Sequence, residues 1–342
     1  MLDNIQLQEA LDLVAEHGGT RSAADASGIA RTTIRNRVQR AKLEGLVPFG
    51  SPDEKIDLPK FEGDDVDAET ILDHMEARFT QRKKFAESHN WFKIGLPTDD
   101  VIGLAVVGDP HIGSNGCNIP LLRRDAKLMA QTPGLHALNI GDTTDNWVGS
   151  LMRLYADNDV SKQTERRLAK WFLQDSGIPW RIWIMGNHDT MDAGFANYLY
   201  GINAKTVAMV DWQAKFRLSF PSQEVRVNAA HNHKGTSIYN RLHGQKREAL
   251  WGEHADIIIA GHHHNWASTQ EELDDGRVVT MCRARGYKWL DSHATKNGFR
   301  NNDHGATILF VIDPKAKTPL GLIKPFADLE EGCEFLTWKR SQ

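Results

Sequence analysis

The chain has 342 residues, of which 40% are hydrophobic and 25% charged, and its formal net charge is −4. This composition is typical of a globular protein with a core of its own, and it excludes a generally basic protein that coats nucleic acid. Three scattered cysteines without CxxC spacing argue against a disulfide framework and favour a reducing compartment. No apolar run reaches the ~18 residues of a membrane helix, and no signal peptide is recognisable, so we expect a cytoplasmic protein.

The first 47 residues predict three short helices. Apolar residues recur at helical spacing from Leu7 to Val14, and Gly18-Gly19 ends this run. Thr20 is placed to cap an alanine-rich second helix, and Gly28 makes the turn into a third helix over about residues 31–44. Small alanines let two helices cross closely. This layout is that of a helix-turn-helix, which would be a small all-α domain over residues 1–47.

Basic side chains gather on the second and third of these helices. Residues 21–42 carry a local charge of +5, whereas the first helix has acidic residues and neither Lys nor Arg. A helix that enters a major groove needs this asymmetry. The segment TRSAADASGIARTTIRNRVQR resembles Fis-like and resolvase-like helix-turn-helix modules. The resemblance implies DNA contacts from Arg31, Thr32, Thr33, Arg35 and Asn36, with Arg37 and Arg40 on phosphates. A solvated basic face used for protein contacts is the alternative.

A Pro- and Gly-punctuated polar stretch at 48–65 predicts a linker, and a charged helix follows at about 67–88. From Val101 onward, short Val- and Ile-rich runs end abruptly in Gly, Asp, Asn or His. These runs are VIGLAVVGD, LHALNIGD, WRIWIMGNHD, EVRVNAAHNHKG and DIIIAGHHH. Helical stretches at 120–130 and 161–174 separate several of them. The alternation predicts an α/β domain over 91–342, with the linker and charged helix occupying 48–90.

Each of the five strand-like runs ends in residues that can bind a metal ion. In chain order these ends are Asp109-Pro-His111, Gly141-Asp142-Thr-Thr-Asp145, Gly186-Asn187-His188-Asp189, His231-Asn-His233 and Gly261-His262-His-His264. Ligands of α/β proteins bind outside the carboxyl ends of the strands, so we expect the five ends to converge on one site. Oxygen and imidazole donors without thiolate suit manganese, iron or zinc better than calcium or magnesium.

The series DxH, GDxxD, GNHD, H and GHxH resembles the signature of the calcineurin-like metallophosphoesterases, over about residues 100–312. The resemblance implies an α/β sandwich of two mixed β-sheets flanked by helices, with two divalent transition-metal ions: manganese first, iron or zinc as alternatives. It implies a first metal bound by Asp109, His111 and His264. It implies a second metal bound by Asn187, His231 and His262, with Asp142 bridging the two.

The same resemblance implies a mechanism of phosphate-ester hydrolysis. Two ions ~3.5–4 Å apart would hold the phosphate and a bridging hydroxide that attacks phosphorus. We expect the bridging position to need a carboxylate, because one oxygen must go to each ion. A histidine beside a carboxylate is suited to protonating the leaving oxygen, so His188 would be the general acid and Asp145 the carboxylate that orients it.

Several assignments stay open at the level of sequence. His233 is the alternative to His231 as a ligand, and Asp189 fits a structural role in the turn as well as a catalytic one. Candidate phosphate contacts are His233, Lys234, His263 and Lys288.

The histidine triplet at 262–264 follows a strand. In extended backbone residues i and i+2 point to the same side. We therefore expect His262 and His264 to face the metals and His263 to point away.

Local departures from relatives bear on the substrate. Asn146 stands where protein Ser/Thr phosphatases of this superfamily carry arginine, which argues against phosphate binding of their kind. The GDPHIG motif resembles the start of SbcD-type nucleases, and HNHKGTSIYN resembles phosphoesterases of phage genomes. We therefore expect a phosphodiesterase or nuclease acting on DNA in a bacterial or phage-infected cell, with a homodimer as an option. The alternatives are an enzyme for small phosphate esters or cyclic nucleotides, localised by the helix-turn-helix, and a non-catalytic DNA-binding or assembly protein.

Overall fold

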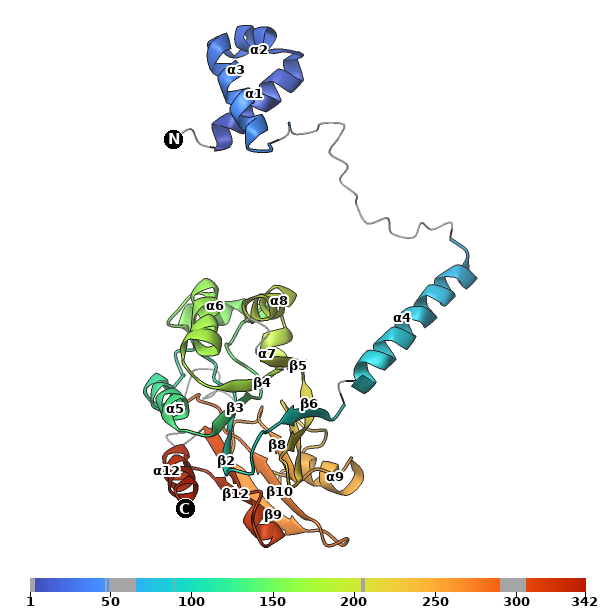
Figure 1. Ribbon diagram of the computed structural model, residues 1–342, viewed down its shortest axis with the longest axis vertical. Coiled ribbons are helices and arrows are strands. Elements are labelled where there is room, and N and C mark those ends of the chain that lie inside the picture. Colours follow the sequence, from blue (N-terminus) through green and yellow to red (C-terminus); the bar gives the residue numbers. More distant parts are fainter. Residues whose placement is uncertain (1–3, 47, 49–65, 89, 204–206, 290–305) are drawn as a thin grey trace. The chain divides into compact units, whose positions relative to one another are not determined.

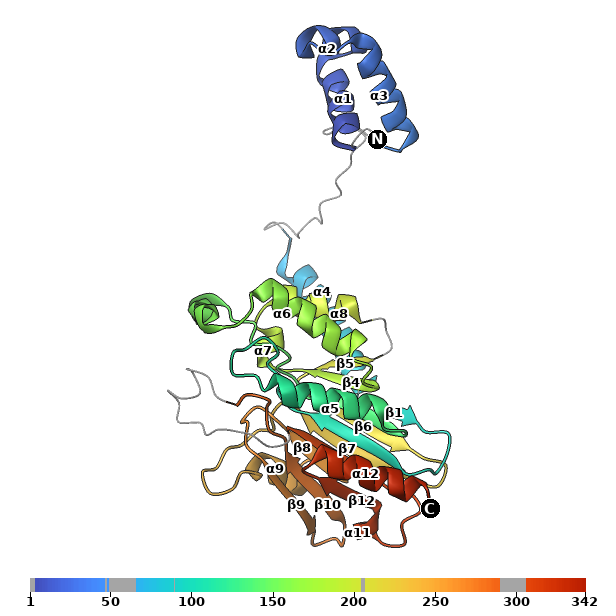
Figure 2. The same cartoon turned by 90° about the vertical axis from the view of Figure 1, so that its left-hand side faces the viewer.

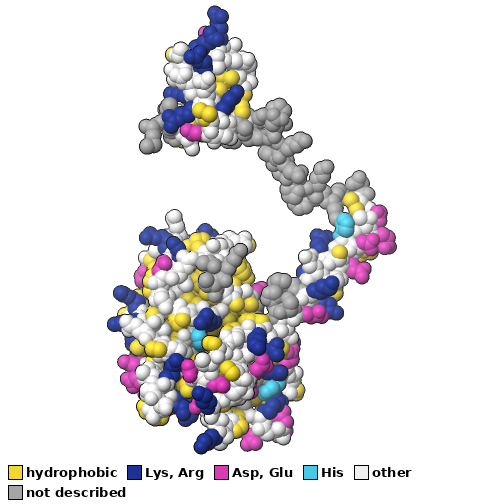
Figure 3. Space-filling view, in the orientation of Figure 1, with side chains coloured by type: hydrophobic (Ala, Val, Ile, Leu, Met, Phe, Trp, Pro, Cys, Tyr) yellow, Lys and Arg dark blue, Asp and Glu magenta, His cyan; other side chains and the backbone are white. Residues whose placement is uncertain are grey.

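The computed structural model describes residues 4–46, 48, 66–88, 90–203, 207–289 and 306–342. The predicted linker lies almost entirely outside these residues. The chain divides into two compact units, residues 1–78 and 79–342, joined within the charged helix α4 (Ala68–Ser88) (Figure 1). Both acidic and basic side chains cover the surface of α4 (Figure 3). In the described part of the chain, no helix combines the length and the apolar character that crossing a membrane requires.

The first unit contains the three predicted N-terminal helices, α1 (Asn4–His17), α2 (Thr20–Ser27) and α3 (Arg31–Leu43). They enclose a small core of Leu7, Ala10, Leu11, Ala23, Ile34, Val38 and Ala41. Gly28 ends α2 in the left-handed conformation, with φ of 70°, as its position between two helices requires. The expected cap at Thr20 is wrong: Gly19 precedes the helix, Thr20 is its first residue, and no side chain caps it.

The second unit contains two mixed sheets of six strands each, which confirms the predicted sandwich. One sheet has the spatial order β1 (Phe92–Gly95), β6 (Gln213–Ser219), β7 (Glu224–Ala230), β8 (Ile257–Ala260), β10 (Val278–Arg283) and β9 (Ala267–Glu272). The other has the order β12 (Ile323–Phe326), β11 (Thr307–Ile312), β2 (Ile102–Val107), β3 (Leu135–Asn139), β4 (Trp180–Met185) and β5 (Ala208–Asp211). The five predicted strands are β2, β3, β4, β7 and β8.

A continuous apolar core fills the space between the two sheets. Its residues come from alternate positions of both sheets, and they include Leu104, Ile184, Val227, Ile257 and Phe310. Strands β2, β3 and β4 are buried along nearly their whole length, because helices cover the opposite face of their sheet. Burial on both faces explains the runs of Val, Ile and Trp in these strands.

Helices cover the outer face of the second sheet and part of the first. Figure 2 shows α5 (Ile119–Gln131) and α12 (Leu329–Arg340) over the second sheet, where Leu122 and Leu336 join its core. The predicted helix at 161–174 becomes α6 (Lys162–Lys170) followed by a π-helical turn (Trp171–Asp175). Shorter elements are a 3-10 helix (Gly149–Asp157), α7 (Asn187–Thr190), α8 (Ala193–Ile202) and α11 (Pro319–Leu322). On the first sheet, α9 (His243–Trp251) lies beside β8 and β10.

Candidate metal centre

The loops that follow the five predicted strands meet at one edge of the sandwich. Strands β2, β3 and β4 are parallel neighbours in one sheet, and β7 and β8 are parallel neighbours in the other. Backbone hydrogen bonds tie successive loops together, from the N–H of His111 to the carbonyl of Asp142 (3.0 Å) and from that of Gly261 to His231 (3.0 Å). Parallel strands thus deliver five separate motifs to one place, as the sequence predicted.

Asp189 holds two of these loops together. Its buried carboxylate accepts hydrogen bonds from the backbone N–H groups of Asp142 (2.8 Å), Thr143 (3.0 Å) and Gly186 (2.9 Å). Burial, together with the charge of Asp142, raises the pKa of Asp189 to about 6. Of the two roles left open for Asp189, the geometry fits the structural one, since both carboxylate oxygens face backbone donors.

Two glycines allow the loops to approach this closely. A Cβ atom on Gly141 would lie 2.5 Å from the nitrogen of Gly186 and 2.8 Å from Nδ1 of His231. A Cβ atom on Gly186 would lie 2.2 Å from Oδ1 of Asp142. The glycines of the GDxxD and GNHD motifs are therefore required by close backbone contact, apart from any role in a turn.

Backbone strain is concentrated in the same loops. Among the described residues, eight other than glycine have positive φ; five of these belong to the motifs and a sixth, Asn146, directly follows one, with φ from 37° to 65°. These six are Asp109, His111, Asp142, Asn146, His262 and His264. Such conformations cost about 1–3 kcal/mol each and persist where the surroundings over-determine them, which is common at functional sites.

The first group of donors consists of Asp109, His111 and His264. Nε2 of His264 lies 3.2 Å from Oδ2 of Asp109 and 3.3 Å from Nε2 of His111. Both carboxylate oxygens of Asp109 are buried, and neither receives a hydrogen bond of good geometry from the described residues. Although burial opposes ionisation, His264 holds the pKa of Asp109 below its usual value. Three converging donors, with both carboxylate oxygens of Asp109 left unsatisfied, fit a cation between them.

The second group consists of Asn187, His231 and His262. Nε2 of His231 lies 2.9 Å from Oδ1 of Asn187 and 3.0 Å from Nδ1 of His262. Nδ1 of His231 faces the carbonyl of Ile140 at 2.9 Å, which fixes the ring so that Nε2 points into the group. Between the two candidate ligands of this strand end, the structure brings His231 to the centre.

Asp142 lies between the two groups. Its Oδ2 atom is 3.3 Å from Nε2 of His231 and 3.8 Å from Nε2 of His111. Oδ1 accepts a hydrogen bond from the backbone N–H of His188 at 2.9 Å. A single oxygen of Asp142 thus faces both groups while the other holds the next loop, an arrangement different from the expected one oxygen for each metal.

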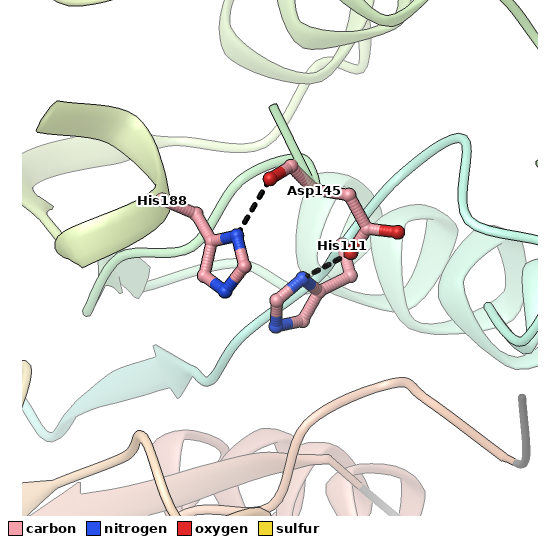
Figure 4. A group of neighbouring side chains, drawn as sticks. All are labelled: His111, Asp145 and His188. Carbon is pink, nitrogen blue, oxygen red and sulfur yellow. Dashed lines mark hydrogen bonds and ion pairs between the residues drawn. The ribbon is translucent and has the colours of Figure 1, made fainter. Parts of the chain in front are cut away.

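His188 lies beside these groups and is oriented differently from the prediction. Its Nδ1 lies 2.6 Å from the main-chain carbonyl of Asp145, whereas the Asp145 carboxylate bonds Nδ1 of His111 at 2.8 Å (Figure 4). Asp145 thus orients His188 through its backbone and not through its side chain. The ring of Trp147 packs edge-on against that of His188, with ring centres 4.9 Å apart. Nδ2 of Asn146 donates to the backbone carbonyl of His188 at 2.7 Å.

The Asp145 carboxylate also contacts a lysine. Nζ of Lys288 lies 2.8 Å from the same Oδ1 atom that His111 bonds. Burial would raise the pKa of Asp145, but its contacts with His111 and Lys288 hold it below the usual value. His111, Asp145 and His188 also lie within ligand distance of one another. The Lys288 ammonium next to Asp145 repels a cation at that point. We therefore favour the two groups joined by Asp142 as the metal-binding positions.

The electrostatics of the two histidine groups differ. Burial and the nearby Lys288 cation lower the pKa of His111 to about 4, so its ring is neutral near pH 7. Burial lowers the pKa of His231 as well, but the hydrogen bond and charge of Asp142 outweigh it and raise that pKa to about 9. A metal ligand must present an unprotonated nitrogen, so a cation bound at His231 has to displace a proton.

The histidine triplet divides as predicted but for a different reason. His262 and His264 lie in the two groups and His263 does not, yet the backbone is not extended, since β8 ends at Ala260 and both outer histidines have positive φ. The ring of His263 packs against that of His262 with ring centres 5.0 Å apart, and its buried Nε2 has no hydrogen-bond partner among the described residues. Burial, with Arg283, lowers its pKa to about 4.

Two of the candidate phosphate contacts have contrasting environments. His233 is 3% exposed, and burial lowers its pKa to about 4, so a phosphate contact from this residue does not fit the structure. Lys234 is exposed on the loop that follows β7.

Trp212, which the sequence did not single out, places its ring 5.2 Å from His231 and donates its backbone N–H to Met185. Its only distinguishing sign is a positive φ, which no sequence pattern reveals.

The candidate DNA-contacting residues all lie on α3. Ile34, Val38 and Ala41 face the core of the small unit. The opposite face exposes Arg31, Thr32, Arg35, Asn36 and Arg40, while Thr33 and Arg37 are partly buried. Arg40 also pairs with Glu44 at 3.1 Å.

The two mixed sheets and the carboxylate, amide and imidazole donors at their edge define a metal-dependent hydrolase of the α/β sandwich class. The sequence profile of the calcineurin-like phosphoesterases matches residues 102–305, and the chain belongs to this family. The family uses divalent metal ions and hydrolyses phosphoesters, and the chain is accordingly a metal-dependent phosphoester hydrolase. The resemblance to this family that the five motifs indicated is confirmed.

The solved structures that match the chain are distant from it in sequence. Vps29 from Entamoeba histolytica, complexed with Zn²⁺, is 13% identical with a TM-score of 0.36, over 66% of this chain and 97% of its own. A 5′-nucleotidase precursor from Thermus thermophilus is 12% identical with a TM-score of 0.35, over 71% and 58%. The Pseudomonas putida nuclease MPE is 13% identical with a TM-score of 0.30, over 65% and 87%. No curated protein sequence matches the chain.

Proposed function

We propose that the chain is a dinuclear metal-dependent phosphodiesterase that cleaves phosphodiester bonds in DNA. The observation that carries the proposal is the arrangement of donors in two neighbouring groups that share one oxygen, Oδ2 of Asp142. One ion would be held by Asp109, His111, Asp142 and His264. The other would be held by Asp142, Asn187, His231 and His262. We expect manganese, with iron or zinc as alternatives, because the donors are oxygen and imidazole without thiolate.

The protein groups around the ions have separate tasks. Bound ions of this kind offset the charge of a phosphate and make hydroxide available near neutral pH. His188 is placed to act as the general acid on the leaving oxygen. Because Nδ1 of His188 faces a carbonyl, its proton stays on that bond, and the proton transferred is the one on Nε2 of the imidazolium. Trp147 restrains the ring in this orientation.

The choice of DNA rests on the small N-terminal unit. Its third helix buries one apolar face and exposes Arg31, Arg35 and Arg40 on the other. A compact three-helix module with a basic exposed helix is typical of helix-turn-helix proteins that place this helix in the major groove. The acidic balance of the whole chain makes this local basic face more distinctive, since general charge does not explain it.

A substrate panel tests the proposal. The manganese-loaded full chain is assayed with single-stranded and double-stranded DNA, RNA, mononucleotides, cyclic nucleotides and bis(p-nitrophenyl) phosphate, with Asp142→Asn as the inactive control. We expect cleavage of DNA and of the aryl diester. Hydrolysis of the aryl diester with intact DNA would refute the nuclease part. Turnover of nucleotides or cyclic nucleotides alone would favour the small-ester enzyme, and no hydrolysis by metal-loaded protein would refute the whole proposal.

A further inference from the structure

Lys288 brings a positive charge into the wall of the metal centre. Its side chain is only 9% exposed, and its Nζ atom lies 2.8 Å from Oδ1 of Asp145 and 5.3 Å from the centre of the Trp147 ring. The backbone of Lys288 pairs with Cys117 in an antiparallel bridge. The ammonium is therefore held by fixed backbone on one side and by a buried carboxylate on the other.

The segment around Lys288 is anchored to the loop of the first motif as well. Tyr287 donates its backbone N–H to the carbonyl of Asp109 at 3.1 Å and accepts from the N–H of Asn118 at 2.8 Å. Trp289 donates to the carbonyl of Gly116 at 2.7 Å. These bonds fix the distance between Lys288 and the Asp109–His111 loop, which is what a residue needs to position a neighbouring ligand.

A single carboxylate oxygen links Lys288 to a candidate ligand. Oδ1 of Asp145 lies 2.8 Å from Nδ1 of His111 and 2.8 Å from Nζ of Lys288. An ionised carboxylate only accepts hydrogen bonds, so Nδ1 of His111 carries the proton. Its Nε2 is then free of a proton and faces Nε2 of His264 at 3.3 Å, in the first group of donors. Lys288, Asp145 and His111 thus form one chain that ends at the position of the first ion.

The charge of Lys288 answers a need of Asp145. The Asp145 side chain is 1% exposed, and its second oxygen, Oδ2, has no hydrogen-bond partner among the described residues. A buried carboxylate with an unsatisfied oxygen is stabilised by a nearby positive charge. Asn146, the next residue along the chain, donates to the backbone carbonyl of His188 and supplies no charge. Lys288 supplies the positive charge from a different part of the chain.

We propose that Lys288 is a positioning residue for the first metal ion, holding Asp145 against His111 so that Nε2 of His111 faces the ion. Its task is therefore different from the direct phosphate contact that the sequence indicated. The inference rests on the proposed function, because it presumes that His111 binds a metal. It adds a residue from outside the five motifs to the machinery of the site.

Metal titration of the full chain tests this role without relying on turnover. Cobalt(II) binding is followed by its visible absorption in the wild type, Lys288→Met, Lys288→Arg and the exposed control Lys170→Met. We expect Lys288→Met to weaken one of the two binding steps by about 10- to 100-fold. The other step and the Lys170→Met control stay at the wild-type affinity, and Lys288→Arg, which keeps the charge, regains most of the loss.

A second variant separates this chain of contacts from a general loss of structure. Asp145→Asn should weaken the same step, and the double variant Lys288→Met/Asp145→Asn should be little worse than Asp145→Asn alone, because both act through His111. Additive losses would overturn the inference. So would unchanged cobalt affinity together with a raised KM for bis(p-nitrophenyl) phosphate, which indicates a phosphate contact. Wild-type protein that binds no cobalt refutes the proposed function instead, whatever the variants do.

Discussion

Replacing Asp189 by alanine should destabilise the catalytic unit severely. The substitution leaves the backbone N–H groups of Asp142, Thr143 and Gly186 buried without the acceptor that now lies 2.8–3.0 Å away. Each buried donor without a partner costs ~1–3 kcal/mol, so the three together cost about 3–9 kcal/mol. That loss is comparable with the whole stability of a typical domain, about 5–15 kcal/mol.

Urea unfolding, monitored by tryptophan fluorescence, measures this loss. Asp175→Ala serves as a control, because Asp175 is exposed on the same unit. Asp189→Asn keeps one acceptor oxygen and should lose less than Asp189→Ala, which provides a measurable variant if the alanine protein does not fold. A loss below about 1 kcal/mol for Asp189→Ala would refute the view that this carboxylate holds the loops together.

Four further outcomes are expected. Asp142→Asn should lose both activity and most bound metal, whereas His188→Ala should keep its metal and lose turnover by ~10²–10⁴-fold; equal metal loss in elemental analysis would contradict these roles. Metal affinity, measured by calorimetry, should fall as pH drops below about 9, because the ion displaces a proton from His231; a flat profile would contradict this. Burial raises the pKa of Glu165 to about 7. The protonated side chain therefore favours the folded state fully at a pH below the glutamate pKa of the unfolded chain, near 4.3, and this contribution to stability is lost as the pH rises through 7. Glu165→Gln should therefore be more stable than wild type above pH 7, by roughly 3 kcal/mol, and nearly equal to it at pH 4 in thermal unfolding; equal stability at pH 8 would count against a buried charge. Arg35→Ala should weaken DNA binding by about 1–3 kcal/mol in fluorescence anisotropy, as for a base-contacting arginine, unlike the charge-matched Arg21→Ala; identical losses would argue against α3 as the recognition helix.

The sequence predicted the fold because the strands that hold the site are buried on both faces. Runs such as Ile102–Val107 and Ile257–Ala260 are continuously apolar and are followed closely by residues that can bind a metal. The sequence alone therefore reveals both the strands and the candidate ligands at their ends. The core face of α3 was equally legible, since Ile34 and Val38 recur at helical spacing. The spacing of apolar residues is enough to predict the buried face of a helix that packs against a single core.

The internal arrangement of the site was harder to predict, because it depends on backbone conformations outside the regular regions. His262 and His264 face the two groups through left-handed backbone and not through strand alternation. The side chain of Asp145 bonds His111 while its carbonyl bonds His188, a choice that no spacing rule distinguishes. Lys288 meets Asp145 from far along the chain. Such contacts are set by loop geometry in three dimensions.

We infer that the site holds two metal ions that act in the hydrolysis of phosphodiester bonds in DNA. Elemental analysis of the manganese-loaded, desalted full chain, with DNA cleavage measured on the same sample, tests it most directly. We expect two ions per chain, with cleavage lost when a chelator removes them and restored when manganese is returned. Fewer than one ion per chain, or undiminished cleavage of DNA in the chelated protein, would contradict it.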